Sequence, residues 1–224
     1  MAKAIKAVIF DFNGTLFNDT HFHDTAWKEF ASRYGKNLSP GELDKNIHGF
    51  TNREIFTYIF KRSLEENELY QFYEEKEEIY RFICQKNSAK CILTKGAEDF
   101  FNYLLEKNIP QTIATASYLP NVELYFNMFH LEHWFQRDHV IYDSGNFRGK
   151  PHPDMFLAAA EKMQVSIPDC MIIEDSEGGI QAARNAKAGV IIAACFKDNH
   201  SNFSKFDYID RIITDFMQLT DYFN

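Results

Sequence analysis

Two kinds of hydrophobic pattern divide the chain. The first hydrophobic stretch is short and continuous, since residues 7–10 read AVIF. From about Asp19 to Lys90, apolar and aromatic residues recur at helical spacing instead, in HDTAWKEFASRYG, NREIFTYIFKRSL and NELYQFYEEKEEIYRFICQK. The pattern predicts an all-helical insert at 19–90. On its last helix we expect a solvated acidic face formed by Glu74, Glu75, Glu77 and Glu78.

From Thr94 onward, helical and continuous apolar segments alternate. KGAEDFFNYLLEKN is followed by IPQTIATAS, PDMFLAAAEKMQ by CMIIED, and GGIQAARNAKAG by VIIAACF, with RIITDF near the end. Continuous apolar strands between amphipathic helices are typical of a parallel sheet that is covered on both faces. We therefore expect an α/β fold, a Rossmann-like parallel sheet flanked by helices, built from residues 1–18 and 91–224 around the inserted helical domain.

The segment AVIFDFNGTLFND allows a second interpretation. Its Asn13-Gly14 pair between hydrophobic residues is a strong local signal for a two-residue β-hairpin turn. A hairpin needs an antiparallel partner, whereas TLFND leads into a predicted helix. We therefore interpret the first strand as one member of the parallel sheet.

Composition narrows the class of protein. The 224 residues, 45% of them apolar, suffice for one large or two small domains with a real core. No run of about 18 apolar residues occurs, and MAKAIKAVIF has no small-residue cleavage site, so we expect a cytoplasmic protein with reduced cysteines. A net charge of −8 without a Lys/Arg cluster disfavours nucleic acid and anionic membranes as partners. We expect a monomer, and the sequence leaves a dimer open.

Residues capable of chemistry follow the predicted strands. They are Asp11, Asn13, Gly14 and Thr15 after AVIF, Thr115, Ala116 and Ser117 after TIA, Lys150 in GNFRGKPHPD, and Glu174 and Asp175 after CMII. The carboxyl ends of parallel strands meet at one edge of the sheet, where such folds bind ligands. We therefore expect three carboxylates, a hydroxyl and an ammonium group to share this edge.

This set of groups suits phosphoryl transfer. An ionised carboxylate at Asp11 can attack phosphorus without a base and form an aspartyl-phosphate. Mg²⁺ would reduce the repulsion between the anions, and Asp11, Asp175 and the carbonyl of Asn13 suit its shell, with Glu174 nearby. Lys150 and the hydroxyl of Thr115 can hold the phosphoryl oxygens, together with the backbone N–H groups after Thr115.

Four motifs in this order, DFNGTLFND, IATAS, GKPHPD and IEDSEGGIQAARNAKAG, resemble those of the haloacid dehalogenase superfamily. The resemblance is to its β-phosphoglucomutase-like and phosphoglycolate phosphatase-like branch. It implies a Mg²⁺-dependent phosphatase for a small phosphorylated metabolite, with Asp11 as nucleophile. Thr115 and Lys150 would bind phosphate, with Ala116 and Ser117 beside them, Asp175 and Glu174 would lie on the metal side, and the helical insert would be the substrate-selecting cap.

Two cap positions bear on a second activity. His23 and Trp27 lie where the sugar-phosphate mutases of this branch have such residues, which makes His23 a candidate substrate contact. The position expected to hold the mutases' substrate-binding arginine is Asn52, with Arg53 one step away. A displacement of one residue turns a side chain by about 100° around a helix. A mutase is therefore the alternative to a phosphatase.

Position 13 departs from the family's pattern. Phosphatases and mutases of the family have an aspartate there, which protonates the leaving oxygen and later activates water. The amide of Asn13 can do neither, and losing a general acid/base typically costs about 10²–10⁴ in rate. Three explanations are open: a substrate with a good leaving group, a proton from His23 or Asp19, or a weak enzyme kept for binding phosphate or a metabolite.

Overall fold

The computed structural model describes residues 5–48, 50–196 and 203–223. The chain forms two compact units, one from the residues up to Asn18 together with those from Ile92 onward, the other from Asp19–Cys91. The sequence pattern had placed the end of the insert one residue earlier, at Lys90. Each unit is described by itself.

The first unit is built on a parallel sheet. In the described part of the chain its six strands are β1 (Ala7–Phe10), β2 (Gln111–Tyr118), β3 (Ile141–Asp143), β4 (Cys170–Glu174), β5 (Val190–Ala194) and β6 (Arg211–Ile213). Their order is β3-β2-β1-β4-β5-β6. Strand β1 pairs in parallel on both sides, with Phe10 beside Ile113 of β2 and Ile173 of β4. The expected α/β fold is confirmed, and Asn13-Gly14 does not form a hairpin.

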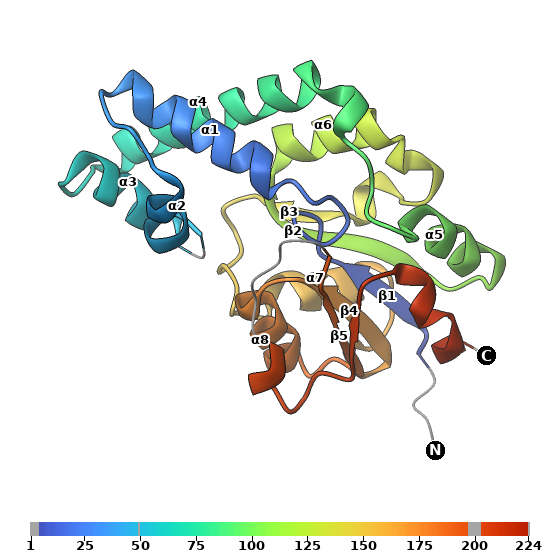
Figure 1. Ribbon diagram of the computed structural model, residues 1–224. Coiled ribbons are helices and arrows are strands. Elements are labelled where there is room, and N and C mark those ends of the chain that lie inside the picture. Colours follow the sequence, from blue (N-terminus) through green and yellow to red (C-terminus); the bar gives the residue numbers. More distant parts are fainter. Residues whose placement is uncertain (1–4, 49, 197–202, 224) are drawn as a thin grey trace. The chain divides into compact units, whose positions relative to one another are not determined.

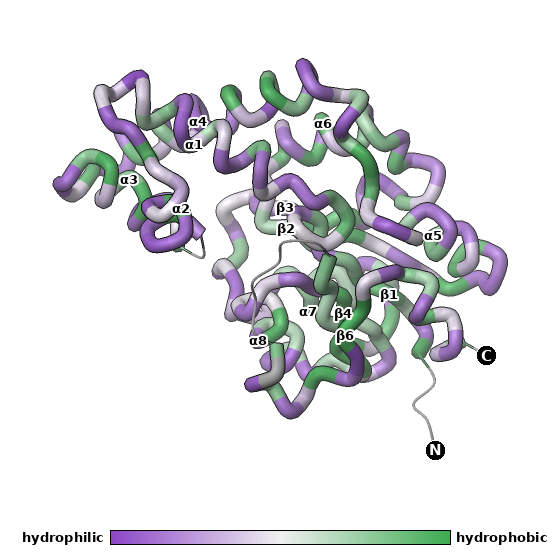
Figure 2. The backbone as a smooth tube through the Cα atoms, in the orientation of Figure 1, coloured by the Kyte–Doolittle hydropathy of each residue, from purple (hydrophilic) through white to green (hydrophobic). Residues whose placement is uncertain are grey.

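Helices cover both faces of this sheet (Figure 1). They are α5 (Ala97–Glu106), α6 (Leu119–Phe129), α7 (Asp154–Lys162) and α8 (Glu177–Ala186). Ile9 of β1 packs in one core cluster with Phe156 of α7 and Ile180 of α8. The next residue, Phe10, points to the opposite face and meets Phe101 of α5 with ring centroids 5.2 Å apart. Figure 2 shows hydrophobic residues concentrated in β1 and β4, as expected for strands buried on both faces.

The pattern of the sequence did not assign α6 or β3. Strand β3 lies at the edge of the sheet. With only three residues, it is too short to show a periodic hydrophobic pattern. Single-turn 3₁₀ segments complete the connections, at Ser88–Lys90, Leu131–His133, Arg137–His139, Ile167–Asp169 and Phe203–Lys205, and a longer one spans Phe216–Phe223.

The second unit is helical, as its spacing predicted. Its helices are α1 (Thr20–Arg33), α2 (Pro40–Asn46), α3 (Asn52–Phe60) and α4 (Glu66–Lys86). Capping boxes at Ser39 and Thr51 satisfy backbone N–H groups at the starts of α2 and α3. Aromatic rings fill the interior, with the centroid of Phe56 5.2 Å from those of both Trp27 and Phe30. None of the helices within the described ranges has the length and apolar character of a membrane span.

The expected solvated acidic face on α4 is wrong for Glu77. Its side chain is buried beside Lys76, whose Nζ donates to Oε1 of Glu77 over 2.8 Å. The Lys76 ammonium also lies 4.8 Å from the centre of the Trp27 ring. A charged side chain is buried at tolerable cost only when it is paired, so the ion pair explains why this part of an EEKEE run faces inward.

Candidate active site

Asp11 lies directly after β1 and is buried, with 5% of the residue exposed. Lys150 Nζ donates to its Oδ1 over 2.5 Å and also donates to Glu174. Burial raises the pKa of Asp11 to about 7; Lys150 opposes this rise and Glu174 adds to it. Burial also opposes the charge on Lys150, but Asp11 and Glu174 outweigh it and raise the lysine's pKa. The two strand-end motifs and the lysine loop therefore meet as one buried ionic cluster.

Glu174, at the end of β4, is held on both carboxylate oxygens. Oε2 accepts from the backbone N–H groups of Asp175 and Ser176 over 2.9 and 2.8 Å and from the Ser176 hydroxyl over 2.9 Å, while Oε1 faces Lys150. A Cβ on Gly179 would lie 1.8 Å from the carboxyl carbon of Glu174, so only glycine leaves space for this carboxylate. Glu174 is thus a fixed counter-charge for Lys150.

The acidic groups suit a divalent cation. Asp11, Glu174 and Asp175 each have a carboxylate oxygen within 4.8 Å of the others, and three carboxylates against the one ammonium of Lys150 leave negative charge in excess. Gly14 has φ +80°, and a Cβ there would lie 2.0 Å from Oδ2 of Asp175, so the loop leaves room for this carboxylate. Hard oxygen donors with excess negative charge fit Mg²⁺. These residues therefore fit the cation that the sequence predicts.

A group of hydroxyls contacts the side chain of Asn13, two residues after Asp11. Asn13 Oδ1 accepts from the hydroxyls of Ser117 over 2.7 Å and Thr115 over 3.3 Å. The Ser117 N–H donates to Thr115 Oγ1 over 3.1 Å, and Ala116 between them is exposed. The Asn13 amide also donates to the hydroxyl of Tyr125 on α6 over 2.8 Å. The structure therefore brings Asn13, in the loop after β1, together with Thr115 and Ser117 of β2, and it adds Tyr125, which no sequence pattern singled out.

His23 lies in α1 of the helical unit, and both its ring nitrogens have partners. Lys76 Nζ is 2.8 Å from Nδ1, and since an ammonium only donates, Nδ1 accepts and the proton is on Nε2. Nε2 lies 3.3 Å from Oδ2 of Asp19, which also accepts from the Tyr80 hydroxyl over 2.6 Å. Tyr80 stacks on the His23 ring with centroids 3.9 Å apart. The imidazole is therefore held in one tautomer.

The other predicted position of this unit, Asn52, is the first residue of α3 and is partly buried. The neighbouring Arg53 is directed to Glu66, with 2.5 Å between Nη2 and Oε1. This ion pair is exposed to solvent and therefore weak. The arginine expected in a mutase is absent from position 52, and Arg53 is its neighbour on the same helix.

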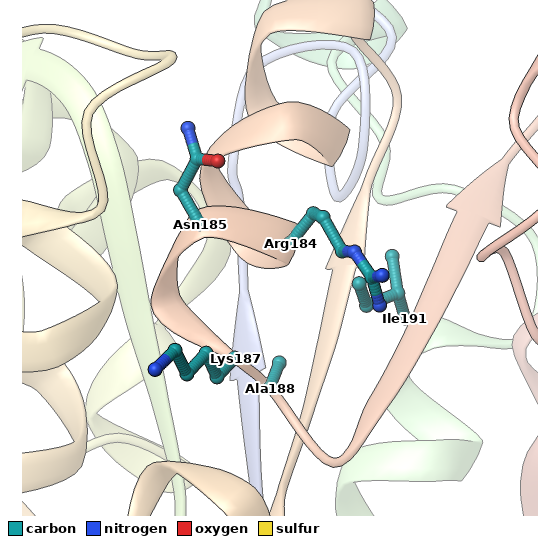
Figure 3. A pocket seen from close by; sticks show the side chains of 5 residues that line it. All are labelled: Arg184, Asn185, Lys187, Ala188 and Ile191. Carbon is teal, nitrogen blue, oxygen red and sulfur yellow. The ribbon is translucent and has the colours of Figure 1, made fainter.

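A separate hollow lies at the C-terminal end of α8, lined by Arg184, Asn185, Lys187, Ala188 and Ile191. Figure 3 shows the Arg184 guanidinium extending toward Ile191, while the Asn185 and Lys187 side chains extend in other directions. The polar groups therefore do not converge on one ligand. The acidic cluster lies at the opposite, N-terminal end of this helix, beside Gly179.

Comparison with known proteins identifies the family. The family model described as haloacid dehalogenase-like hydrolase matches residues 5–187, well over half of the chain. The chain belongs to this family. The resemblance drawn from the four motifs is thereby confirmed, and the protein is an enzyme of the hydrolase class.

Individual relatives agree with this membership. A crystal structure of a haloacid dehalogenase hydrolase, family IA, variant 3, from Entamoeba histolytica HM-1:IMSS superposes with a TM-score of 0.90, at 34% identity over 98% of each chain. The phosphorylated carbohydrates phosphatase of Thermotoga maritima is 26% identical over 81% of this chain and 82% of its own length. The β-phosphoglucomutase of Bacillus subtilis is 28% identical over 81% of this chain and 80% of its own length.

Proposed function

We propose that this haloacid dehalogenase-like hydrolase is a Mg²⁺-dependent phosphatase that acts on a small phosphorylated metabolite. The observation that carries the proposal is the buried Asp11 carboxylate, held by Lys150 beside Asp175 at the carboxyl edge of the sheet. Attack on a phosphate ester requires a nucleophile, here Asp11, next to a positive charge, here Lys150. It also requires oxygen ligands for a metal ion, which Asp175 and Glu174 can supply. The phosphatase name of the Thermotoga maritima relative supports this reaction class.

In the first step, a carboxylate oxygen of Asp11 attacks phosphorus. The new O–P bond forms as the ester O–P bond breaks, and the leaving oxygen takes a proton from water. Lys150, Thr115 and Ser117 hold the phosphoryl oxygens during this transfer. In the second step, water attacks the phosphoryl group, releases inorganic phosphate and regenerates Asp11. Bound by Asp11, Asp175 and the Asn13 carbonyl, Mg²⁺ would neutralise charge between the carboxylates and the phosphoryl group.

Proton transfer is the weak point of this site. The Asn13 amide is engaged with Ser117 and Tyr125 and has no acidic proton to give. Within the helical unit, His23 is held between Lys76 and Asp19. The contacts therefore favour a substrate whose leaving group departs without protonation, or a slow enzyme, over proton supply from His23 or Asp19.

We further propose that the helical unit acts as the family's cap. His23 and Asn52 are the two positions in it that we assign to substrate selection. A cap changes the substrate without changing the chemistry, because the reacting groups all belong to the α/β unit. The identity of the metabolite therefore has to come from a screen.

The decisive experiment is a hydrolysis screen with Mg²⁺ and with a chelator. The substrates are p-nitrophenyl phosphate, acetyl phosphate and a panel of sugar phosphates, and Asp11→Asn is the control. Release of inorganic phosphate that needs both Mg²⁺ and Asp11 supports the proposal. Interconversion of sugar phosphates without phosphate release would show a mutase, and phosphate binding without any turnover would show a binding protein.

A further inference from the structure

Thr15 lies in the loop after β1, and none of the residue is exposed. Neither step of the proposed reaction uses its side chain. A buried hydroxyl without a partner costs free energy, so a threonine in this place needs an acceptor. Among the residues that the structure describes, Thr15 Oγ1 has one hydrogen-bond partner, Oδ1 of Asp175 at 3.3 Å. A carboxylate only accepts, so the hydroxyl donates to Asp175.

The loop after β1 contacts both carboxylate oxygens of Asp175. Oδ1 accepts from Thr15, and Oδ2 lies so close to Gly14 that a Cβ there would be 2.0 Å away. The last torsion of an aspartate side chain is broad and does not by itself fix the plane of the carboxylate. The contacts with Thr15 and Gly14 therefore restrict how this carboxylate can turn.

The backbone around Thr15 is held by its own hydrogen bonds. The Thr15 carbonyl accepts from the Thr94 hydroxyl over 2.8 Å. The carbonyl of Leu16 accepts from the Thr94 N–H over 2.9 Å, and the Leu16 N–H donates to the Phe12 carbonyl over 2.8 Å. A β-branched side chain has few rotamers once its backbone is fixed. The Thr15 hydroxyl is therefore in place before any cation binds.

We infer that Thr15 is a positioning residue for the cation. Its hydroxyl holds the Asp175 carboxylate where one oxygen lies within 4.8 Å of carboxylate oxygens of Asp11 and Glu174. The inference rests on the proposed function, since it assigns Asp175 to Mg²⁺. Removing the hydrogen-bond partner of a metal ligand typically lowers metal affinity about 10–100-fold. A distance of 3.3 Å is long for a hydroxyl donor, so we expect the low end of that range.

The test compares two substitutions that remove different halves of the side chain. Thr15→Val loses the hydroxyl and keeps the branched shape, whereas Thr15→Ser keeps the hydroxyl and loses a methyl group. By calorimetry, the Kd of Mg²⁺ should rise about tenfold in Thr15→Val and change by less than about twofold in Thr15→Ser. A role in packing alone predicts the reverse order, because serine leaves a small cavity and valine does not.

Kinetics with p-nitrophenyl phosphate give a second measurement. The Mg²⁺ concentration for half-maximal rate should rise about tenfold in Thr15→Val, like the Kd. The kcat at saturating Mg²⁺ should recover, because Thr15 acts only through Asp175. The matched control is Thr112→Val in β2, another fully buried threonine, whose hydroxyl donates to the His139 carbonyl over 2.9 Å. This control should lower the melting temperature without changing Mg²⁺ affinity.

Three results would overturn the inference. They are an unchanged Mg²⁺ affinity in Thr15→Val, an equal loss of affinity in Thr15→Ser, and a loss of kcat in Thr15→Val that saturating Mg²⁺ does not restore. Thr15→Ala, which also lacks the hydroxyl, replaces Thr15→Val if melting curves show that the valine variant does not fold. If the unmodified protein binds no Mg²⁺, the metal requirement in the proposed function fails, and the inference falls with it.

Discussion

Replacing Asn13 by aspartate tests what the departure from the family's pattern costs. The substitution keeps the shape of the side chain and puts an acidic group beside the nucleophile loop. Ser117 and Thr115 can still donate to it, and the Tyr125 hydroxyl can turn to donate where it now accepts. One hydrogen bond reverses direction and the contact between the Ser117 and Tyr125 hydroxyls loses its proton, while each side chain keeps one partner. We therefore expect the free energy of unfolding to change by less than about 1.5 kcal/mol.

The gain in rate should depend on the leaving group. A general acid/base typically contributes about 10²–10⁴. Hydroxyl donors around the new carboxylate favour its ionised form and reduce its use as an acid. We therefore expect Asn13→Asp to raise kcat for an alkyl phosphate by at least about tenfold. This figure lies below the general range because the hydroxyl donors make the new carboxyl group a poorer acid. An aryl phosphate should gain less, because its oxygen departs without protonation, although water attack on the phosphoenzyme can quicken for both.

The assay is steady-state kinetics of both proteins on one alkyl and one aryl phosphate. Mass spectrometry first has to show that residue 13 is unmodified, because an Asn-Gly step can deamidate to the variant itself. Rapid alkyl phosphate hydrolysis by the unmodified protein, with no change on substitution, would refute the reasoning and show that another group carries the proton.

Three further changes test other parts of the site. Asp11→Asn should abolish turnover and leave the fold intact. With a chelator present, the difference in melting temperature, variant minus unchanged protein, should increase between pH 4 and pH 8. The reason is that burial raises the pKa of Asp11 from 3.8 to about 7, so the folded state gives up this proton later than the unfolded chain and loses stability across that window. Asp175→Ala should weaken Mg²⁺ binding at least about tenfold by calorimetry, and unchanged affinity would remove it from the metal site. Gly179→Ala should lower the free energy of unfolding by about 1–3 kcal/mol in denaturant unfolding, because its Cβ would meet Glu174. The control is Gly41→Ala in α2, whose Cβ would meet nothing within 4 Å.

The sequence by itself predicted the fold class and the family, although it did not reveal α6 or the short edge strand β3. Continuous apolar strands such as CMII, alternating with amphipathic helices, are typical of a parallel sheet that is buried on both faces. Because the carboxyl ends of such strands share an edge, the meeting of Asp11, Lys150 and Glu174 could be expected before any distance was known. Both predictions need only the hydrophobic periodicity and the identity of the residues that follow each strand in the chain.

The tertiary structure decided which side chains touch. In the sequence, Tyr125 looks like any other apolar residue of a helix. Only the packing of α6 against the loop after β1 brings its hydroxyl to Asn13, which is 112 residues away in the chain. Lys76 and Glu77 lie in a charged run that looks solvated, yet they are buried as a pair against Trp27. Hydrogen bonds and ion pairs act over about 3 Å and depend on direction, so their partners are fixed by packing between distant segments, which no local pattern records.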